Sequence, residues 1–195
     1  MDQFEYLSVL TAVVIGLGIT HLLVGVGRLL RRPDRPTLYW IHTLQVGTTF
    51  LALVNQWWVV FSWADFPNMT LLHHLFLLAS PISLFLATEL LFPDQDLEER
   101  RLRDHYYRVH RPYYLLLAVL GPLDVLDTLL KGGWDRLMTL GLEYLPMQSF
   151  STLVCVVAAF VRAPRYHAFV QIGAVIAFLV SAYLWKPNLE AILLR

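Results

Sequence analysis

Apolar residues fill windows of about 20 positions along most of the chain, and short polar connections separate these windows. A helix of that length crosses the hydrocarbon core of a bilayer, because each residue adds about 1.5 Å along the helix axis. The windows predict six helical spans, at about 6–30, 37–63, 70–92, 112–131, 136–162 and 166–186. We therefore expect an all-α fold, a polytopic transmembrane helical bundle that forms a single domain over residues 1–195.

Composition supports a membrane protein and excludes two other classes. Hydrophobic residues make up 57% of the chain and charged residues 15%, and the mean hydropathy is +0.55. The formal net charge is zero, so no global basic field would attract nucleic acid. Cys155 is the only cysteine, which excludes an intrachain disulfide and the cysteine-based metal motifs.

The segment 93–111 is the one long connection between the predicted spans. Its acidic residues come first and its basic residues last, and Leu102, Tyr106 and Val109 share one face at helical spacing. This pattern predicts a short amphipathic helix on the cytoplasmic membrane surface, beginning at Asp94 and ending at Pro112. A solvated, charged connector is the alternative.

The basic residues are divided unequally between the two sides of the predicted bundle. Eleven lie on the side of the connections after spans one, three and five, and four lie on the opposite side. The side with the excess of Lys and Arg is normally cytoplasmic. The sequence therefore predicts that both termini are extracytoplasmic and that residues 93–111 form a cytoplasmic loop.

Span two carries a polar stripe that begins at His42. Polar residues recur there at intervals of three and four, which places them on one helix face. The stripe comprises His42, Gln45, Thr49 and Gln56, with Thr48 and Asn55 beside it. Because polar groups in hydrocarbon need partners or water, the stripe should face the bundle interior. Interhelical hydrogen bonding is sufficient to explain Gln45, Thr48 and Thr49 individually.

Ionisable residues on several spans reach similar depths in the predicted outer half. Asp124 and Asp127 share a face of span four, roughly 6–10 Å from its outer end, and His74, Glu143 and Gln56 lie at matching depths. Intramembrane acids commonly mark ion or proton pathways. We therefore expect a ligand site or ion pathway formed by Asp124, Asp127, Glu143, His74, Gln56, Asn55 and His21. The structural alternative is that Asp127 pairs with Lys131 and reaches the surface.

Near the inner ends of spans one and three, Arg28 and Glu89 lie at similar predicted depths and should form a structural ion pair. Carboxylate and imidazole groups can also bind a divalent ion, but neither an H-E-x-x-H motif nor paired cysteines support a particular metal. Serine-hydrolase and nucleotide-binding motifs are absent, so the sequence leaves any cofactor or metal unidentified and favours a protein without enzymatic chemistry.

The first third of the chain contains "EYLSVLTAVVIGLGITHLLVGVGRLLRRPDRPTLYWIHTLQVGTTF", followed by Trp57 and Trp58. Over residues 5–63 it resembles small bacterial multi-span inner-membrane proteins to which no function is attached. The resemblance implies a bacterial inner membrane location and assigns no functional residue.

Three functions are compatible with this sequence. The first is transport or sensing of protons, a cation or a small polar solute at the polar intramembrane site. The second is an accessory or assembly subunit of a larger membrane complex, without chemistry of its own. The third is a membrane-embedded, metal-dependent lipid enzyme. A homo-oligomer in the lipid bilayer is compatible with each.

Overall fold

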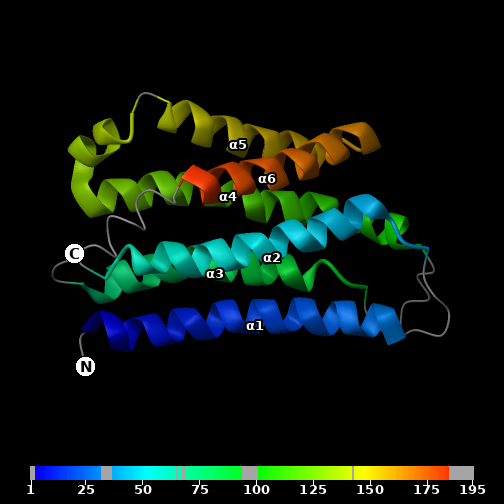
Figure 1. The fold of residues 1–195 in the computed structure, drawn as a ribbon, viewed down its shortest axis with the longest axis horizontal. Coiled ribbons are helices and arrows are strands. Elements are labelled where there is room, and N and C mark those ends of the chain that lie inside the picture. Colours follow the sequence, from blue (N-terminus) through cyan, green and yellow to red (C-terminus); the bar gives the residue numbers. More distant parts are fainter. Residues whose placement is uncertain are drawn as a thin grey trace.

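The computed structural model describes residues 3–31, 37–64, 66, 69–93, 101–141 and 143–184. This part of the chain is all-helical apart from its connections, which confirms the predicted all-α class. Its helices are α1 (Gln3–Arg31), α2 (Trp40–Phe61), α3 (Leu71–Glu89), α4 (Leu102–Thr139), α5 (Tyr144–Phe160) and α6 (Pro164–Leu184). They run alternately in opposite directions along the long axis of the bundle (Figure 1).

Four of these helices, α1, α3, α4 and α6, are long and apolar enough to cross a membrane. The other two differ for reasons visible in their sequences. The α5 helix has only 17 residues, and the polar stripe lowers the hydropathy of α2. The structure therefore supports a membrane protein with a helical bundle fold.

The helices begin and end at two opposite ends of the bundle (Figure 1). Trp63 follows α2 at one end, and this end also holds the start of α1 and the end of α6. His167 lies in the first turn of α6 at the other end. We call these the Trp63 end and the His167 end.

The bundle is built outward from a central group of helices. Within the described ranges, α1 packs only on α2 and α3, and α5 packs on α4 and α6. The α2, α3 and α4 helices lie between these outer elements, and their core side chains include Leu53, Leu84 and Tyr113, each almost fully buried. The interior of the bundle between α2 and α6 is thus the place for an enclosed site.

Helix α4 corrects the prediction for residues 93–111. Pro112 does not end a surface helix, because α4 runs without interruption from Leu102 through Pro112 and Pro122. Leu102 and Tyr106 do share a face, but they are 1% and 0% exposed within the bundle and do not lie on a membrane surface. Their burial offsets the roughly 3 kcal/mol that an interior proline costs a helix. Asp94 lies outside the described residues.

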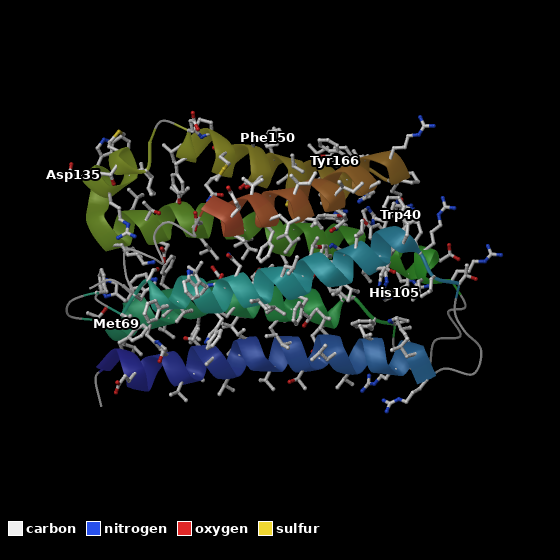
Figure 2. All side chains as sticks on the ribbon, viewed as in Figure 1. Trp40, Met69, His105, Asp135, Phe150 and Tyr166 are labelled. Atoms are coloured by element: carbon white, nitrogen blue, oxygen red, sulfur yellow. The ribbon has the colours of Figure 1, made fainter. Side chains whose placement is uncertain are left out.

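The far end of α4 corrects the predicted start of span five. The helix breaks at Gly132 and Gly133, where Gly133 has a φ of 61° that favours glycine. The chain then turns across the Trp63 end, where Asp135 is labelled in Figure 2, and α4 ends at Thr139. Helix α5 therefore begins at Tyr144 and not near residue 136.

Two histidines satisfy carbonyl groups at the end of α3. The Nε2 atom of His42 on α2 donates to the Leu91 carbonyl at 2.7 Å, and Nε2 of His105 on α4 donates to the Leu90 carbonyl at 3.0 Å. The last carbonyls of a helix have no partner within the helix. These bonds give both histidines a structural role that ties α3 to its neighbours.

Candidate functional site

A cavity of about 360 Å³ lies between α2, α3, α4, α5 and α6. Its walls are mostly apolar, but every one of these helices also contributes polar side chains. The polar lining comprises Thr48, Thr49, Asn55, Gln56, Ser80, Tyr113, Tyr114, Asp124, Asp127, Gln148, Ser151 and Gln171. Asn55, Ser151 and Ala174 are lining residues that are exposed, so the cavity opens to one side between α2, α5 and α6.

Asp124 faces this cavity and accepts hydrogen bonds from α5. The Tyr144 hydroxyl donates to Oδ2 of Asp124 at 2.6 Å, and Nε2 of Gln148 donates to the same oxygen. Thr128 supports Tyr144, since its hydroxyl lies 3.0 Å from that of Tyr144. Among the described residues, no basic side chain forms an ion pair with Asp124. Its carboxylate is therefore hydrogen-bonded but has no paired positive charge.

Asp127 lies one turn further along the same face of α4, and its charge is compensated. The Nζ atom of Lys131 lies 2.7 Å from Oδ2, and Nε1 of Trp63 donates to Oδ1 at 2.7 Å. Lys131 also donates to the Ser62 hydroxyl and stacks over the Trp63 ring at 4.8 Å from its centre. The structure thus contains the Asp127–Lys131 pair that was the structural alternative for Asp127.

The part of the cavity nearer the His167 end is lined by neutral hydrogen-bonding groups. The Thr48 hydroxyl lies 2.7 Å from Oε1 of Gln171, and Nε2 of Gln171 donates to the Tyr114 hydroxyl at 2.9 Å. The Tyr113 hydroxyl lies 2.8 Å from that of Thr49. Uncharged donors and acceptors therefore line this part of the cavity, and the carboxylates lie toward the Trp63 end.

The structure brings together four of the residues predicted for the site. Asp124, Asp127, Gln56 and Asn55 all line the cavity. The inward placement of the two carboxylates agrees with the cost of a charge that faces lipid, about 2.5–3.5 kcal/mol on insertion scales.

The other three residues predicted for the site lie elsewhere. Glu143 is exposed before α5, because that helix starts at Tyr144. His74 is buried on α3, but it does not line the cavity, and its Nδ1 atom has no partner among the described residues. His21 lies on α1, which contributes no lining residue.

The predicted pair between Arg28 and Glu89 is replaced by a contact between His21 and Glu89. Nδ1 of His21 lies 3.0 Å from a carboxylate oxygen of Glu89, and Arg28 forms no ion pair with Glu89 within the described ranges. Arg28 lies seven residues after His21, roughly 10 Å further along α1. Depth predicted from the sequence does not show that α1 and α3 are shifted by about two helical turns relative to each other along their axes.

Gln45 also departs from expectation. It is 1% exposed, yet neither of its side-chain amide atoms has a hydrogen-bond partner in the part of the chain that the structure describes. The interhelical hydrogen bond predicted for this residue is therefore not formed with any described group. Thr48 and Thr49, in contrast, bond to Gln171 and Tyr113 as the same prediction proposed.

Sequence reasoning missed the site residues on α5 and α6. Tyr144 and Gln148 are four residues apart, and so are His167 and Gln171, so each pair shares one helix face. The same test of spacing that identified the stripe on α2 would have identified them. Tyr114 carried no such signal, because tyrosine near a predicted helix end is equally expected at a membrane interface.

The described residues contain no group of three or more His, Cys, Asp or Glu side chains placed to hold a metal ion. Neither family models, curated proteins nor solved structures match this chain.

Proposed function

We propose that this chain is a six-span protein of the bacterial inner membrane whose cavity binds a proton or a small cation, for transport or sensing. Asp124 is the binding carboxylate. The observation that carries this proposal is the difference between the two acids: Lys131 pairs with Asp127, whereas no described basic group pairs with Asp124.

An uncompensated carboxylate inside a membrane bundle is costly, and a bound positive charge lowers that cost. Tyr144 and Gln148 hold the Asp124 side chain in place and leave the cavity side open to a ligand. At about 360 Å³ the cavity is larger than a bare ion needs and lies at the small end of ligand pockets, which span roughly 300–1,000 Å³. A hydrated ion, water molecules that carry a proton, or a small organic cation suits this space.

The distribution of basic residues supports an orientation with the His167 end in the cytoplasm. Eight described arginines belong to this end: Arg28, Arg31, Arg101, Arg103, Arg108, Arg111, Arg162 and Arg165. Figure 2 shows side chains with nitrogen tips projecting there. Lys131 and Arg136 belong to the Trp63 end. Since an excess of arginine is typical of the cytoplasmic side, the proposed orientation has both termini and the Asp124 half of the cavity outside that compartment.

The test is ion flux in proteoliposomes, with separate arms for H⁺, Na⁺, K⁺ and methylammonium under an imposed membrane potential. We expect flux in one arm, and Asp124→Asn should reduce it about tenfold or more, as loss of an essential proton or ion carrier does. Asp135→Asn is the matched control, because Asp135 is an exposed acid on the same helix outside the cavity.

Two results would contradict the proposal. One is flux that does not depend on Asp124, and the other is wild-type protein with no flux and no equilibrium binding of any of the four cations. In either case the polar cavity serves stability, and a role as accessory or assembly subunit becomes the preferred function.

A further inference from the structure

Beyond the cavity, toward the His167 end, three buried side chains form a continuous chain of hydrogen bonds. The Tyr114 hydroxyl, which lines the cavity, lies 3.0 Å from the Tyr106 hydroxyl. The Tyr106 hydroxyl lies 2.9 Å from Nδ1 of His167, and Tyr114 lies 3.3 Å from the same nitrogen. All three residues are 0% exposed. We infer that Tyr114, Tyr106 and His167 form the cytoplasmic half of a proton pathway that begins at Asp124, an inference that rests on the proposed function.

The hydrogen bonds have a definite direction. Nε2 of His167 lies 2.8 Å from the Val161 carbonyl, which can only accept, so Nε2 carries a hydrogen. In the neutral imidazole Nδ1 is then the acceptor, and we assign its donor as the nearer hydroxyl, that of Tyr106 at 2.9 Å against 3.3 Å for Tyr114. Tyr114 in turn donates to Tyr106 and accepts from Nε2 of Gln171. Each hydroxyl in the chain therefore points from the cavity toward His167.

This direction allows one proton to pass with all bonds balanced. A proton from water in the cavity forms a new O–H bond on Tyr114 while the original Tyr114 proton moves to the Tyr106 oxygen. The Tyr106 proton moves to Nδ1 of His167 and produces an imidazolium. No oxidant, reductant or second reactant is required. The hydroxyls end with one proton each, and the added charge resides on His167.

The surroundings of His167 favour a short-lived imidazolium and not a stable one. Among the described residues, the titratable groups near its ring are Tyr106, Tyr107, His110 and Tyr114 from α4 and Tyr166 from α6, with Arg162 close to His110. None of these groups is a carboxylate that would stabilise an imidazolium. The exposed residues Arg162, Ala163 and Arg165 adjoin His167 in the chain, so the cytoplasmic surface is close. Release is complete when water at this surface accepts the Nε2 proton; the ring is then neutral with its proton on Nδ1, and rotation of the ring restores the starting tautomer.

Buried tyrosines can also bond to each other for stability alone, and the experiment separates the two roles. Full-length protein is reconstituted in liposomes that contain a pH-sensitive dye, and proton flux is driven by a potassium diffusion potential of either sign. Tyr106→Phe removes the central hydroxyl and keeps the ring, so that the chain reaches Nδ1 of His167 only through the longer contact from Tyr114, at 3.3 Å. Tyr39→Phe is the matched control, since within the described residues its hydroxyl bonds to Tyr107 alone, at 3.2 Å, in the same group of aromatic rings.

We expect Tyr106→Phe to slow proton flux about tenfold or more, as loss of a proton-transfer group does, while Tyr39→Phe leaves the rate unchanged. His167→Gln should have the same effect as Tyr106→Phe, because an amide cannot accept the transferred proton; it also serves if Tyr106→Phe does not fold. Wild-type rates in both variants, with flux still lost in Asp124→Asn, would overturn this pathway and leave the proposed function intact. Flux of Na⁺, K⁺ or methylammonium without proton flux would also overturn the pathway and leave the proposed function intact. Absence of all cation flux and binding would overturn both.

Discussion

Asp127 and Lys131 form an ion pair one turn apart on α4, with 2.7 Å between the carboxylate oxygen and the ammonium nitrogen. The side chain of Lys131 is only 4% exposed, and the Trp63 ring covers the ammonium. The pair neutralises one of the two acids that line the cavity. Asp124, three residues earlier, forms no ion pair within the part of the chain that the structure describes.

Lys131→Met should destabilise the protein, because it leaves the Asp127 carboxylate largely buried without its cation. Breaking one partner of a buried pair costs about 3–5 kcal/mol, and some exposure of Asp127 favours the lower value. Thermal unfolding in mild detergent measures the effect. The Asp127→Asn/Lys131→Met double variant should be more stable than Lys131→Met alone, since no buried charge then lacks a partner. Equal losses in the single and double variants would show that the charge pair is not the cause.

Much of the bundle could be predicted from periodicity alone. The polar stripe on α2 has helical spacing, and the structure buries His42, Gln45 and Thr49 on one face. The inward placement of Asp124 and Asp127 could also be predicted. A charge that faces lipid is costly, and the spacing of residues along the sequence gives both their depth and the helix face that they share.

The remaining errors arose where tertiary packing or backbone conformation decides. Pro112 is a stop signal by local rules, but burial of the neighbouring Tyr113 and Tyr114 carries α4 through it. The depth predicted for Glu143 depends on a helix that starts at residue 136, whereas the turn at Gly132 and Gly133 delays that start to Tyr144. Depth along the membrane normal also does not tell which way the His74 side chain faces around α3. Nor does it tell how far α1 and α3 are shifted relative to each other along their axes.

Gly121→Ala should weaken the packing of α4 against α5 beside the site. A Cβ atom at Gly121 would lie 2.1 Å from the Thr152 hydroxyl and 3.2 Å from the Gln148 carbonyl. Overpacking of this kind costs about 1–3 kcal/mol, which detergent unfolding would detect. Gly16→Ala is the control, because no atom lies within 4 Å of its added Cβ; it should be neutral or stabilising. Equal melting temperatures for Gly121→Ala and Gly16→Ala would contradict the predicted overpacking at Gly121.

His42→Phe should reduce stability without changing the cavity, of which His42 is not a lining residue. The variant keeps an aromatic ring but removes the donor to the Leu91 carbonyl, and a buried carbonyl left without a partner costs about 1–3 kcal/mol. Thr43→Ala, at an exposed position on the same turn, should leave the melting temperature unchanged. A melting temperature for His42→Phe equal to that of the wild type would remove the capping role.

The membrane orientation and the crossing of α5 can be tested together by single-cysteine labelling. Cys155 is first replaced by serine, and cysteine is then introduced at Asp135 or Arg165, exposed positions on either side of α5. The excess of arginine at the His167 end predicts that this end is cytoplasmic. A membrane-impermeant maleimide should therefore label Asp135→Cys in intact spheroplasts and Arg165→Cys only after permeabilisation. The reverse pattern would invert the orientation and place Asp124 in the cytoplasmic half. Labelling of both positions from one side would show that α5, with its 17 residues, does not cross, and the six-span topology would then be wrong.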